Sequence, residues 1–265
     1  MATRVVDQPI KKFEGETLTV PASNGTRDAY NIRPGYQEIL IEPVAAMRLQ
    51  FVPKITSILF YDSSNTKWTD ILKEYPHFLD RTNAVDVGVL SGMTTADSLY
   101  IGTAGIVGGE RINVGTAVNN NTADLTAAYS PASGDWTSLT VASDGTASGG
   151  ATLAQDGLVL FTVPTNWGYR NLTDLSVPGT PPKSEAAFWQ KLTVSALVDT
   201  PILLENLTVV GQIGVGIDST TAATGGIWLK ATTEYTMDVA EDVGALEIMA
   251  QAASATTARV TWIRR

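Results

Sequence analysis

The stretch from Asp135 to Trp167 decides the fold, and it reads DWTSLTVASDGTASGGATLAQDGLVLFTVPTNW. Apolar residues at Leu139 and Val141, and a nearly continuous apolar run from Leu158 to Val163, indicate two short strands. Asp-Gly pairs favour turns, because glycine accepts a positive φ and aspartate can bond its own backbone two residues on. The stretch therefore predicts a hairpin of an antiparallel sheet, closed at each end by a tryptophan.

Gly145 lies in the predicted turn of this hairpin, within the sequence Ser143-Asp-Gly-Thr146. A turn of this kind often needs a positive φ, which a β-branched residue resists. We therefore predict that Gly145→Val destabilises the fold, with thermal unfolding as the measurement.

The rest of the chain repeats short strands and turn residues. Apolar residues alternate with polar or small ones over residues 47–51, 213–217 and 235–239. The one helix candidate is Lys67 to Tyr75, with Thr66 as its cap and Pro76 as its end. Charged residues are only 17% of the 265 residues. These features predict an all-β protein: an antiparallel, jelly-roll-like β-sandwich built as two β-modules, with at most one short helix.

We expect three parts along the chain. Residues 1–15 are polar and contain Pro9, so they read as an N-terminal arm ordered by a neighbouring molecule. Residues 16–96 and 211–265 share short strands and small-residue turns, which predicts one β-sandwich formed by the two chain ends. Residues 97–210 are richer in Asp-Gly turns and tryptophan, which predicts a central, jelly-roll-like β-sandwich.

The formal net charge is −9, and the chain has no basic run beyond two adjacent pairs, Lys11-Lys12 and Arg264-Arg265. A phosphate-binding surface needs clustered basic residues, so we expect neither nucleic-acid nor anionic-membrane binding. The chain has no cysteine, which excludes disulfides and thiolate metal sites and fits a reducing cytosol. The first ten residues lack the apolar core of a signal peptide, so we expect a protein made soluble in the cytoplasm.

Two features that often indicate an enzyme are weak here. His77, the only histidine, follows Pro76 in a predicted loop, and the chain has no Gly-x-Ser-x-Gly nucleophile elbow. The glycines of Gly211-Gln-Ile-Gly214-Val-Gly216 alternate with apolar residues, which is typical of close backbone packing in a strand rather than of a nucleotide loop. The sequence predicts no enzyme: no catalytic, cofactor-binding or metal-ligating residue is assigned, and no cofactor is expected.

Two turns offer oxygen atoms that calcium accepts as ligands, Asp62-Ser-Ser-Asn65 and Asp144-Gly-Thr146. Asx-turns explain both, because no dense run of carboxylates accompanies them. Zinc is nearly excluded by one histidine and no cysteine. A pair of carboxylates suited to sugar hydrolysis stays open, since any fold can bring two of the 27 acidic residues together.

Six tryptophans are dispersed along the chain: Trp68, Trp136, Trp167, Trp189, Trp228 and Trp262. Packing in cores and at sheet edges is the usual role of dispersed tryptophans. An exposed cluster of them would instead form a sugar-stacking platform, which keeps a carbohydrate-binding interpretation open.

One series of motifs resembles a β-sandwich module of tailed-bacteriophage structural proteins. It comprises Asp97-Ser-Leu-Tyr-Ile-Gly102, Asp135-Trp136, Ser143-Asp-Gly-Thr146, Gly157 with Pro164 and Trp167, and Phe188-Trp189 with Leu192 to Leu197. The resemblance covers residues 98–205, with weaker similarity at the two ends. It departs at Gln190, where an apolar residue is usual, and at Lys191, where arginine is common.

The resemblance implies a non-enzymatic virion protein, made in the host cytoplasm, that acts as a homo-oligomer and binds other virion proteins. Within virions we favour an accessory capsid protein, a decoration or cement protein on the outer shell that binds the major capsid protein. A major capsid protein is disfavoured, because its usual fold has a long spine helix that this chain lacks. A tail, neck or baseplate component is the alternative, and a carbohydrate- or receptor-binding module is the rival from another class.

Overall fold

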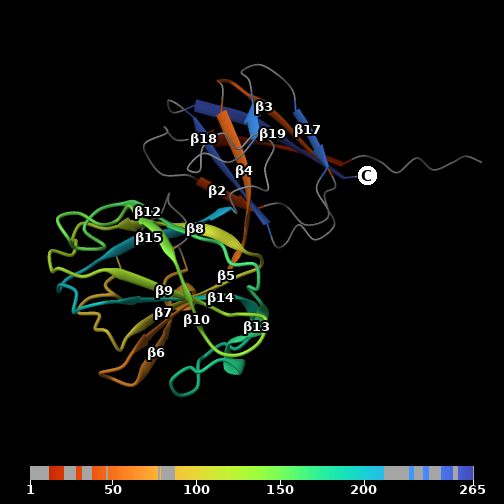
Figure 1. The fold of residues 1–265 in the computed structure, drawn as a ribbon. Helices are drawn as coiled ribbons and strands as arrows, with labels where there is room; N and C mark the ends of the chain where they lie inside the picture. Colours follow the sequence, from red (N-terminus) through yellow and green to blue (C-terminus); the bar gives the residue numbers. More distant parts are fainter. Residues whose placement is uncertain are drawn as a thin grey trace, which may run out of the picture. The chain divides into compact units, whose positions relative to one another are not determined.

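The structure, a computed structural model, describes residues 12–20, 28–31, 38–45, 47–76, 78, 87–211, 227–229, 235–238, 246–252 and 256–264. The chain divides into two compact units. One comprises Met1–Phe51 with Gly216–Arg265, and the other comprises Val52–Val215. All named strand pairs are antiparallel, so the expected all-β, antiparallel class is confirmed (Figure 1).

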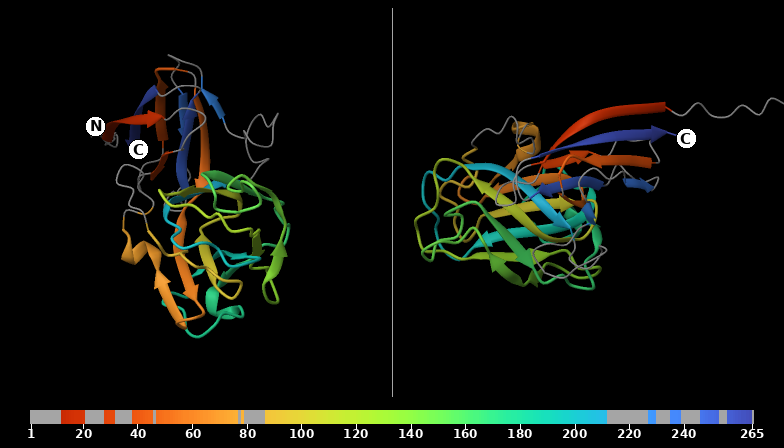
Figure 2. Two further views of the ribbon diagram at one scale, coloured as in Figure 1. Left: turned by 90° about the vertical axis from the view of Figure 1, so that its left-hand side faces the viewer. Right: turned by 90° about the horizontal axis from the view of Figure 1, so that it is seen from above.

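The first unit contains strands from both ends of the chain. One sheet has the order β1-β19-β3-β17, formed by Lys12–Val20, Thr256–Arg264, Glu38–Pro43 and Tyr235–Asp238. The other has the order β16-β4-β18-β2, formed by Ile227–Leu229, Met47–Pro53, Leu246–Ala252 and Asp28–Asn31. The red β1 and the blue β19 lie side by side in Figure 2, in a register without a bulge from Lys12↔Arg264 to Val20↔Thr256. The two chain ends therefore pair directly.

The second unit is a sandwich of two layers (Figure 1). Its seven-stranded sheet has the order β10-β9-β14-β7-β5-β6, with β13 beside β14. These strands are Thr137–Leu139, Leu125–Tyr129, Ala186–Val194, Ser98–Thr103, Ile55–Asp62, Lys67–Asp70 and Tyr169–Asn171. The four-stranded sheet has the order β11-β12-β8-β15, formed by Val141–Asp144, Gly157–Phe161, Val107–Val114 and Leu204–Gly211. The one α-helix of the described residues, α1 (Ile71–Glu74), and the 3-10 helix η2 (Leu172–Asp174) are both short.

Alternation along the strands builds the core between these two layers. Antiparallel partners point to the same side of a sheet, and side chains alternate along each strand. Ile101 of β7, Val159 of β12 and Leu207 of β15 face inward, and each is 0% exposed. Burial of such side chains contributes about 1.5–3 kcal/mol each. The apolar alternation read from the sequence thus becomes the packing that holds the sandwich together.

The central hairpin forms from a shorter part of its predicted stretch. β11 and β12 pair antiparallel, with a shift of register between Val141 and Ser143. The preceding residues, Thr137–Leu139, instead form β10 and pair with β9 in the other sheet. The chain therefore changes sheet at Thr140, which places Trp136 on the seven-stranded layer and the Asp-Gly loop on the four-stranded one.

Gly145 is needed for a different reason from the one the sequence suggested. Its φ is not in the left-handed region, unlike that of five other glycines. A Cβ at Gly145 would lie 2.8 Å from Leu158 O and 2.9 Å from Leu158 N. Gly145→Val is therefore still expected to destabilise the fold, because the added side chain collides with the β12 backbone, and thermal unfolding remains the measurement.

The expected helix at Lys67 to Tyr75 is mostly wrong. Lys67–Asp70 is the edge strand β6, paired with β5 through the tight turn at 63–66, and only Ile71–Glu74 is helical. The cap is Asp70, whose side chain accepts a hydrogen bond from Lys73 N, rather than Thr66. Pairing with a neighbouring strand has overridden the local helical periodicity.

The unit boundaries also differ from the expected ones. Residues 52–96 belong to the second unit, whereas we expected the whole of 16–96 in the sandwich of the chain ends. The cause is β5, which pairs with β7 along Ile55–Tyr61 and is buried on both faces. Residues 12–15 of the expected arm belong to β1, and residues 1–11 lie outside the described residues.

Candidate functional site

The outer face of the seven-stranded sheet holds the largest group of chemistry-bearing side chains. Tyr61, Trp68, Tyr100 and Trp136 form a row of aromatic rings across β5, β6, β7 and the start of β10. Successive ring centroids are 5.1, 5.1 and 5.6 Å apart, and each pair is tilted. Tilted contacts of this kind add about 0.5–1.5 kcal/mol each beyond the area they bury.

A long connection, residues 170–185, crosses this row, and we call it the strap. Three indoles donate to its backbone: Trp68 Nε1 to Pro178 O at 2.9 Å, Trp136 Nε1 to Ser176 O at 3.0 Å, and Trp189 Nε1 to Arg170 O at 3.0 Å. Leu172 and Leu175 of the strap pack into the same cluster as Tyr100 and Trp189. The proline-rich connection is therefore a fixed cover over the sheet.

The far end of the strap is held by an ion pair and a hydrogen bond. Lys183 Nζ lies 3.2 Å from Asp70 Oδ2, and Asp70 is itself buried. Ser57 Oγ donates to Glu185 Oε1 at 2.5 Å. Asp70 thus both caps α1 and anchors the strap.

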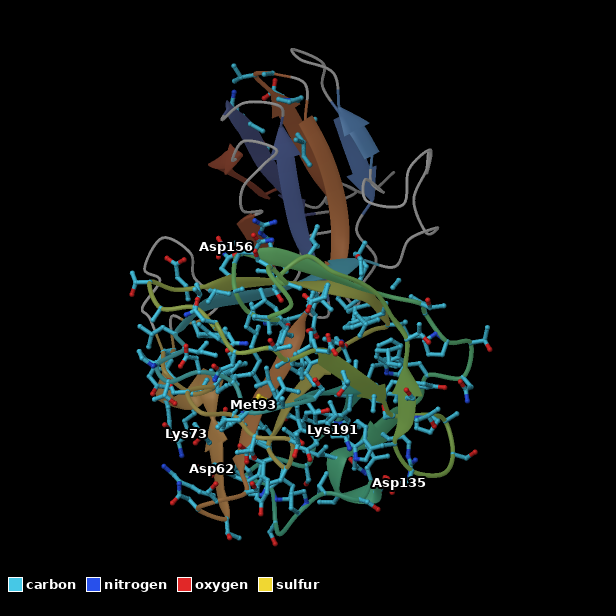
Figure 3. All side chains as sticks on the ribbon, turned by 60° about the vertical axis from the view of Figure 1, so that its left-hand side comes forward. Asp62, Lys73, Met93, Asp135, Asp156 and Lys191 are labelled. Atoms are coloured by element: carbon cyan, nitrogen blue, oxygen red, sulfur yellow. The ribbon has the colours of Figure 1, made fainter. Side chains whose placement is uncertain are left out.

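Asp135 bonds the strap at Ser176, and Lys191 lies on the same side of the unit (Figure 3). Asp135 Oδ1 accepts from Ser176 N and from Trp136 N, both at 2.8 Å. Hydrogen bonds from Ser176 are the main cause that lowers the pKa of Asp135. Burial lowers the pKa of Lys191, with the charge of Asp135 opposing it, and Lys191 Nζ lies 5.1 Å from the Trp136 ring centroid.

The tryptophans of this unit are engaged in packing rather than presented as a platform. Trp167 and Trp189 are buried, while Trp68 and Trp136 are partly buried against the core cluster. The Trp136 ring has Lys191 and Tyr100 as neighbours. Rings with these contacts offer little open surface to a sugar. The side chains of Trp228 and Trp262 lie outside the described residues.

Beyond the strap the same face is open and rich in hydroxyls. The residues that share this side by register are Thr126 and Ala128 of β9, Ser138 of β10, and Thr193 of β14. Thr126 and Thr193 are bonded to each other, Oγ1 to Oγ1, at 2.6 Å. We call this group the threonine face. Its members are small or hydroxyl side chains without charge, Lys191 lies beside Ala128, and such a surface suits a protein contact better than it suits chemistry.

The two turns considered for calcium use their carboxylates locally. Asp62 accepts from Asn65 N and Asn65 Nδ2, as an Asx-turn does. Asp144 Oδ1 accepts from Thr146 N and Thr146 Oγ1, and Asp144 Oδ2 accepts from Thr152 Oγ1. Among the described residues no three acidic or histidine side chains cluster as metal ligands would.

Asp97, which begins the motif series of the phage resemblance, is a buried carboxylate with four donors. Its Oδ1 accepts from Ser63 N and Ser63 Oγ at 2.7 and 2.6 Å, and its Oδ2 from Thr94 N and Thr94 Oγ1 at 2.7 and 3.0 Å. Burial raises the pKa of Asp97, but these hydrogen bonds together outweigh it, so the pKa lies below its ordinary value. Asp97 therefore joins the turn after β5 to the start of β7.

We expect Asp97→Asn to lose roughly 3 kcal/mol of unfolding free energy at pH 7, because the amide nitrogen cannot accept two of the four bonds. Because the pKa of Asp97 is lower in the folded chain than in the unfolded chain, its ionised form stabilises the fold. This contribution is present above the ordinary aspartate pKa and is lost as the pH falls through the pKa of the folded state. Urea unfolding should show that the difference in unfolding free energy between parent and variant shrinks below about pH 4. An equal difference in unfolding free energy at pH 7 and pH 3 would contradict the conclusion that Asp97 is ionised in the folded chain.

The other sequence features considered above lie partly or wholly outside the described residues. His77 lies outside the described residues. Of the glycine series, Gly211 ends β15, and residues 212–216 are not described. Sequence reasoning missed Glu110 and the indole bonds to the strap. The only signal for Glu110 was a lone acid within the otherwise mostly apolar β8.

No protein-family model, curated protein or solved structure matches the chain. Within the described part of the chain, no helix is long and apolar enough to cross a bilayer.

Proposed function

We propose that this chain is a non-enzymatic virion structural protein that binds the outer shell of a bacteriophage capsid as a decoration or cement protein. It acts by binding other virion proteins through its folded surface. It does so as a homo-oligomer whose N-terminal residues reach a neighbouring molecule. The motif series from Asp97 to Leu197, with its resemblance to a phage β-sandwich module, is what suggested the class.

The observation that carries the proposal is that the acidic and indole side chains of the second unit hold its loops in place. Asp97, Asp135 and Asp144 each accept several hydrogen bonds from backbone or hydroxyl groups beside them. Trp68 and Trp136 hold the strap through their indoles. A unit whose acids and indoles serve to fix loops suits a scaffold that binds through its surface. The threonine face is the described surface best suited to such a contact.

Light scattering of the full chain, alone and mixed with empty shells of the major capsid protein from the same genome, tests the proposal. Saturable binding at a fixed ratio to capsid subunits is the expected result. Failure to bind shells, together with a closed ring in solution, would favour the tail, neck or baseplate alternative. Failure to bind shells together with binding to host glycans would favour a receptor-binding module.

Deleting residues 1–11 should weaken shell binding while leaving the chain folded, because the cut ends before β1. Deleting residues 1–20 serves as the contrast. It removes β1 and leaves the nine β19 residues that pair with it without that partner, so it should destabilise the first unit. Circular dichroism and shell co-sedimentation measure the two effects. Loss of folding on the shorter deletion would mean that residues 1–11 belong to a sheet rather than to an arm.

A further inference from the structure

Glu110 is a carboxylic acid enclosed in the interior of the second unit. It sits in the middle of β8, the strand between β12 and β15, and is 0% exposed. Its direct partners on the two neighbouring strands are Val159 and Val209, both buried. Neither carboxyl oxygen has a hydrogen-bond partner among the described residues. An ionised carboxylate in such a place is far more costly than a neutral one.

The two middle rows of the facing sheet supply no cation to Glu110. One of these rows is Ile58, Ile101, Gln190 and Tyr129, and the other is Phe60, Leu99, Leu192 and Ala127. Tyr129 is the only titratable residue in these rows, and its hydroxyl donates to Asn166 Oδ1. Gln190 is also 0% exposed, and within the described part of the chain its side-chain amide oxygen and nitrogen have no hydrogen-bond partner. Two unpartnered polar groups thus lie in one apolar interior.

The charged residues nearest in sequence or register do not neutralise Glu110. Arg111 follows it on β8 and therefore points to the opposite face, where its charge interacts with that of Asp156. Asp144 lies in the same row, beyond Val159, and is itself an acid held by Thr146 and Thr152. Lys191 lies on the outer side of the other sheet, over Trp136. Burial accordingly raises the pKa of Glu110 to about 8.

We propose that Glu110 is a pH-sensitive latch in the core of the second unit: the sandwich is closed while this side chain is neutral and opens when it ionises. The closed unit then holds a proton that the unfolded chain releases. Since the folded pKa lies above the ordinary glutamate value, this stability is fully present below about pH 4.5 and is lost as the pH rises through about 8. The latch acts near neutral pH, where ordinary glutamates do not titrate.

Urea unfolding of the full chain between pH 5 and pH 9, followed by tryptophan fluorescence, measures the latch. Four of the six tryptophans lie in residues 52–215. One-proton linkage predicts that the unfolding constant of the parent rises about tenfold per pH unit, relative to that of Glu110→Gln, between the unfolded and folded pKa values. Glu205→Gln, on the neighbouring β15, is the control and should keep the parent's pH dependence.

Equal pH dependence of the parent and Glu110→Gln would overturn the proposal. If Glu110→Gln does not fold, infrared spectroscopy of the parent decides the question. A neutral-acid carbonyl band present at pH 6 and lost above pH 9 with the folded signal is the expected result. Absence of that band at pH 6 would mean that Glu110 is ionised in the closed sandwich, and the latch would be rejected.

Discussion

Gly157→Ala is expected to abolish folding of the second unit, with a loss above about 4 kcal/mol of unfolding free energy. A Cβ at Gly157 would lie 2.1 Å from Gly145 C, 2.2 Å from Gly145 O and 2.3 Å from Thr146 N. These are backbone atoms, so no side-chain rotation relieves the collision. Separating them would break the hydrogen bond from Gly145 N to Leu158 O and displace the loop that Asp144 holds.

Urea unfolding followed by tryptophan fluorescence measures this effect, and Gly88→Ala is its matched control. A Cβ at Gly88 meets only side-chain atoms at 3.5 Å, an ordinary contact. That variant should stay within about 1 kcal/mol of the parent, since alanine at a compatible site changes stability little. A stable Gly157→Ala protein would show that β12 and the Asp-Gly loop separate at small cost, and the steric account of this hairpin would fail.

The Asp-Gly hairpin shows what local sequence can and cannot predict. The pairing of Val141–Asp144 with Gly157–Phe161 follows from apolar residues on both sides of turn-forming ones. The assignment of Thr137–Leu139 to the other sheet does not follow from the local sequence, because it depends on pairing with β9. The role of Gly145 was equally hidden, since the close backbone of Leu158 exists only after pairing. Turn chemistry is local, whereas sheet membership is set by distant strands.

The candidate site was less predictable than the fold. Asp135, Trp136 and Trp189 stood out in the sequence, but nothing local to them specifies the strap that all three of them bond. Lys67–Asp70 carried helical periodicity and became a strand, because β5 offered an open edge. Glu110 needed knowledge of which face of β8 is inward. In each case the missing information is a partner far away in the chain.

Trp189→Ala is expected to cost about 3–5 kcal/mol, the usual range for removing a large buried aromatic side chain. Trp189 is 0% exposed at the centre of the cluster beneath the strap. A Cβ at Gly102, its direct partner on β7, would lie 3.0 Å from the indole carbons Cη2 and Cζ3, so the ring already fills the space above that glycine. Its Nε1 also donates to Arg170 O at the start of the strap. Removal therefore leaves a cavity and an unbonded carbonyl together.

Two matched variants separate these contributions. Trp189→Phe keeps most of the ring but loses the bond to Arg170 O, so it should cost less than Trp189→Ala by the cavity term. Trp136→Ala removes a partly buried indole that also bonds the strap, through Ser176 O. Because Trp136 buries less of its surface, its loss should be smaller than that of Trp189, and urea unfolding measures all three. If Trp136→Ala proved as costly as Trp189→Ala, the strap bonds rather than the buried ring would hold this face together.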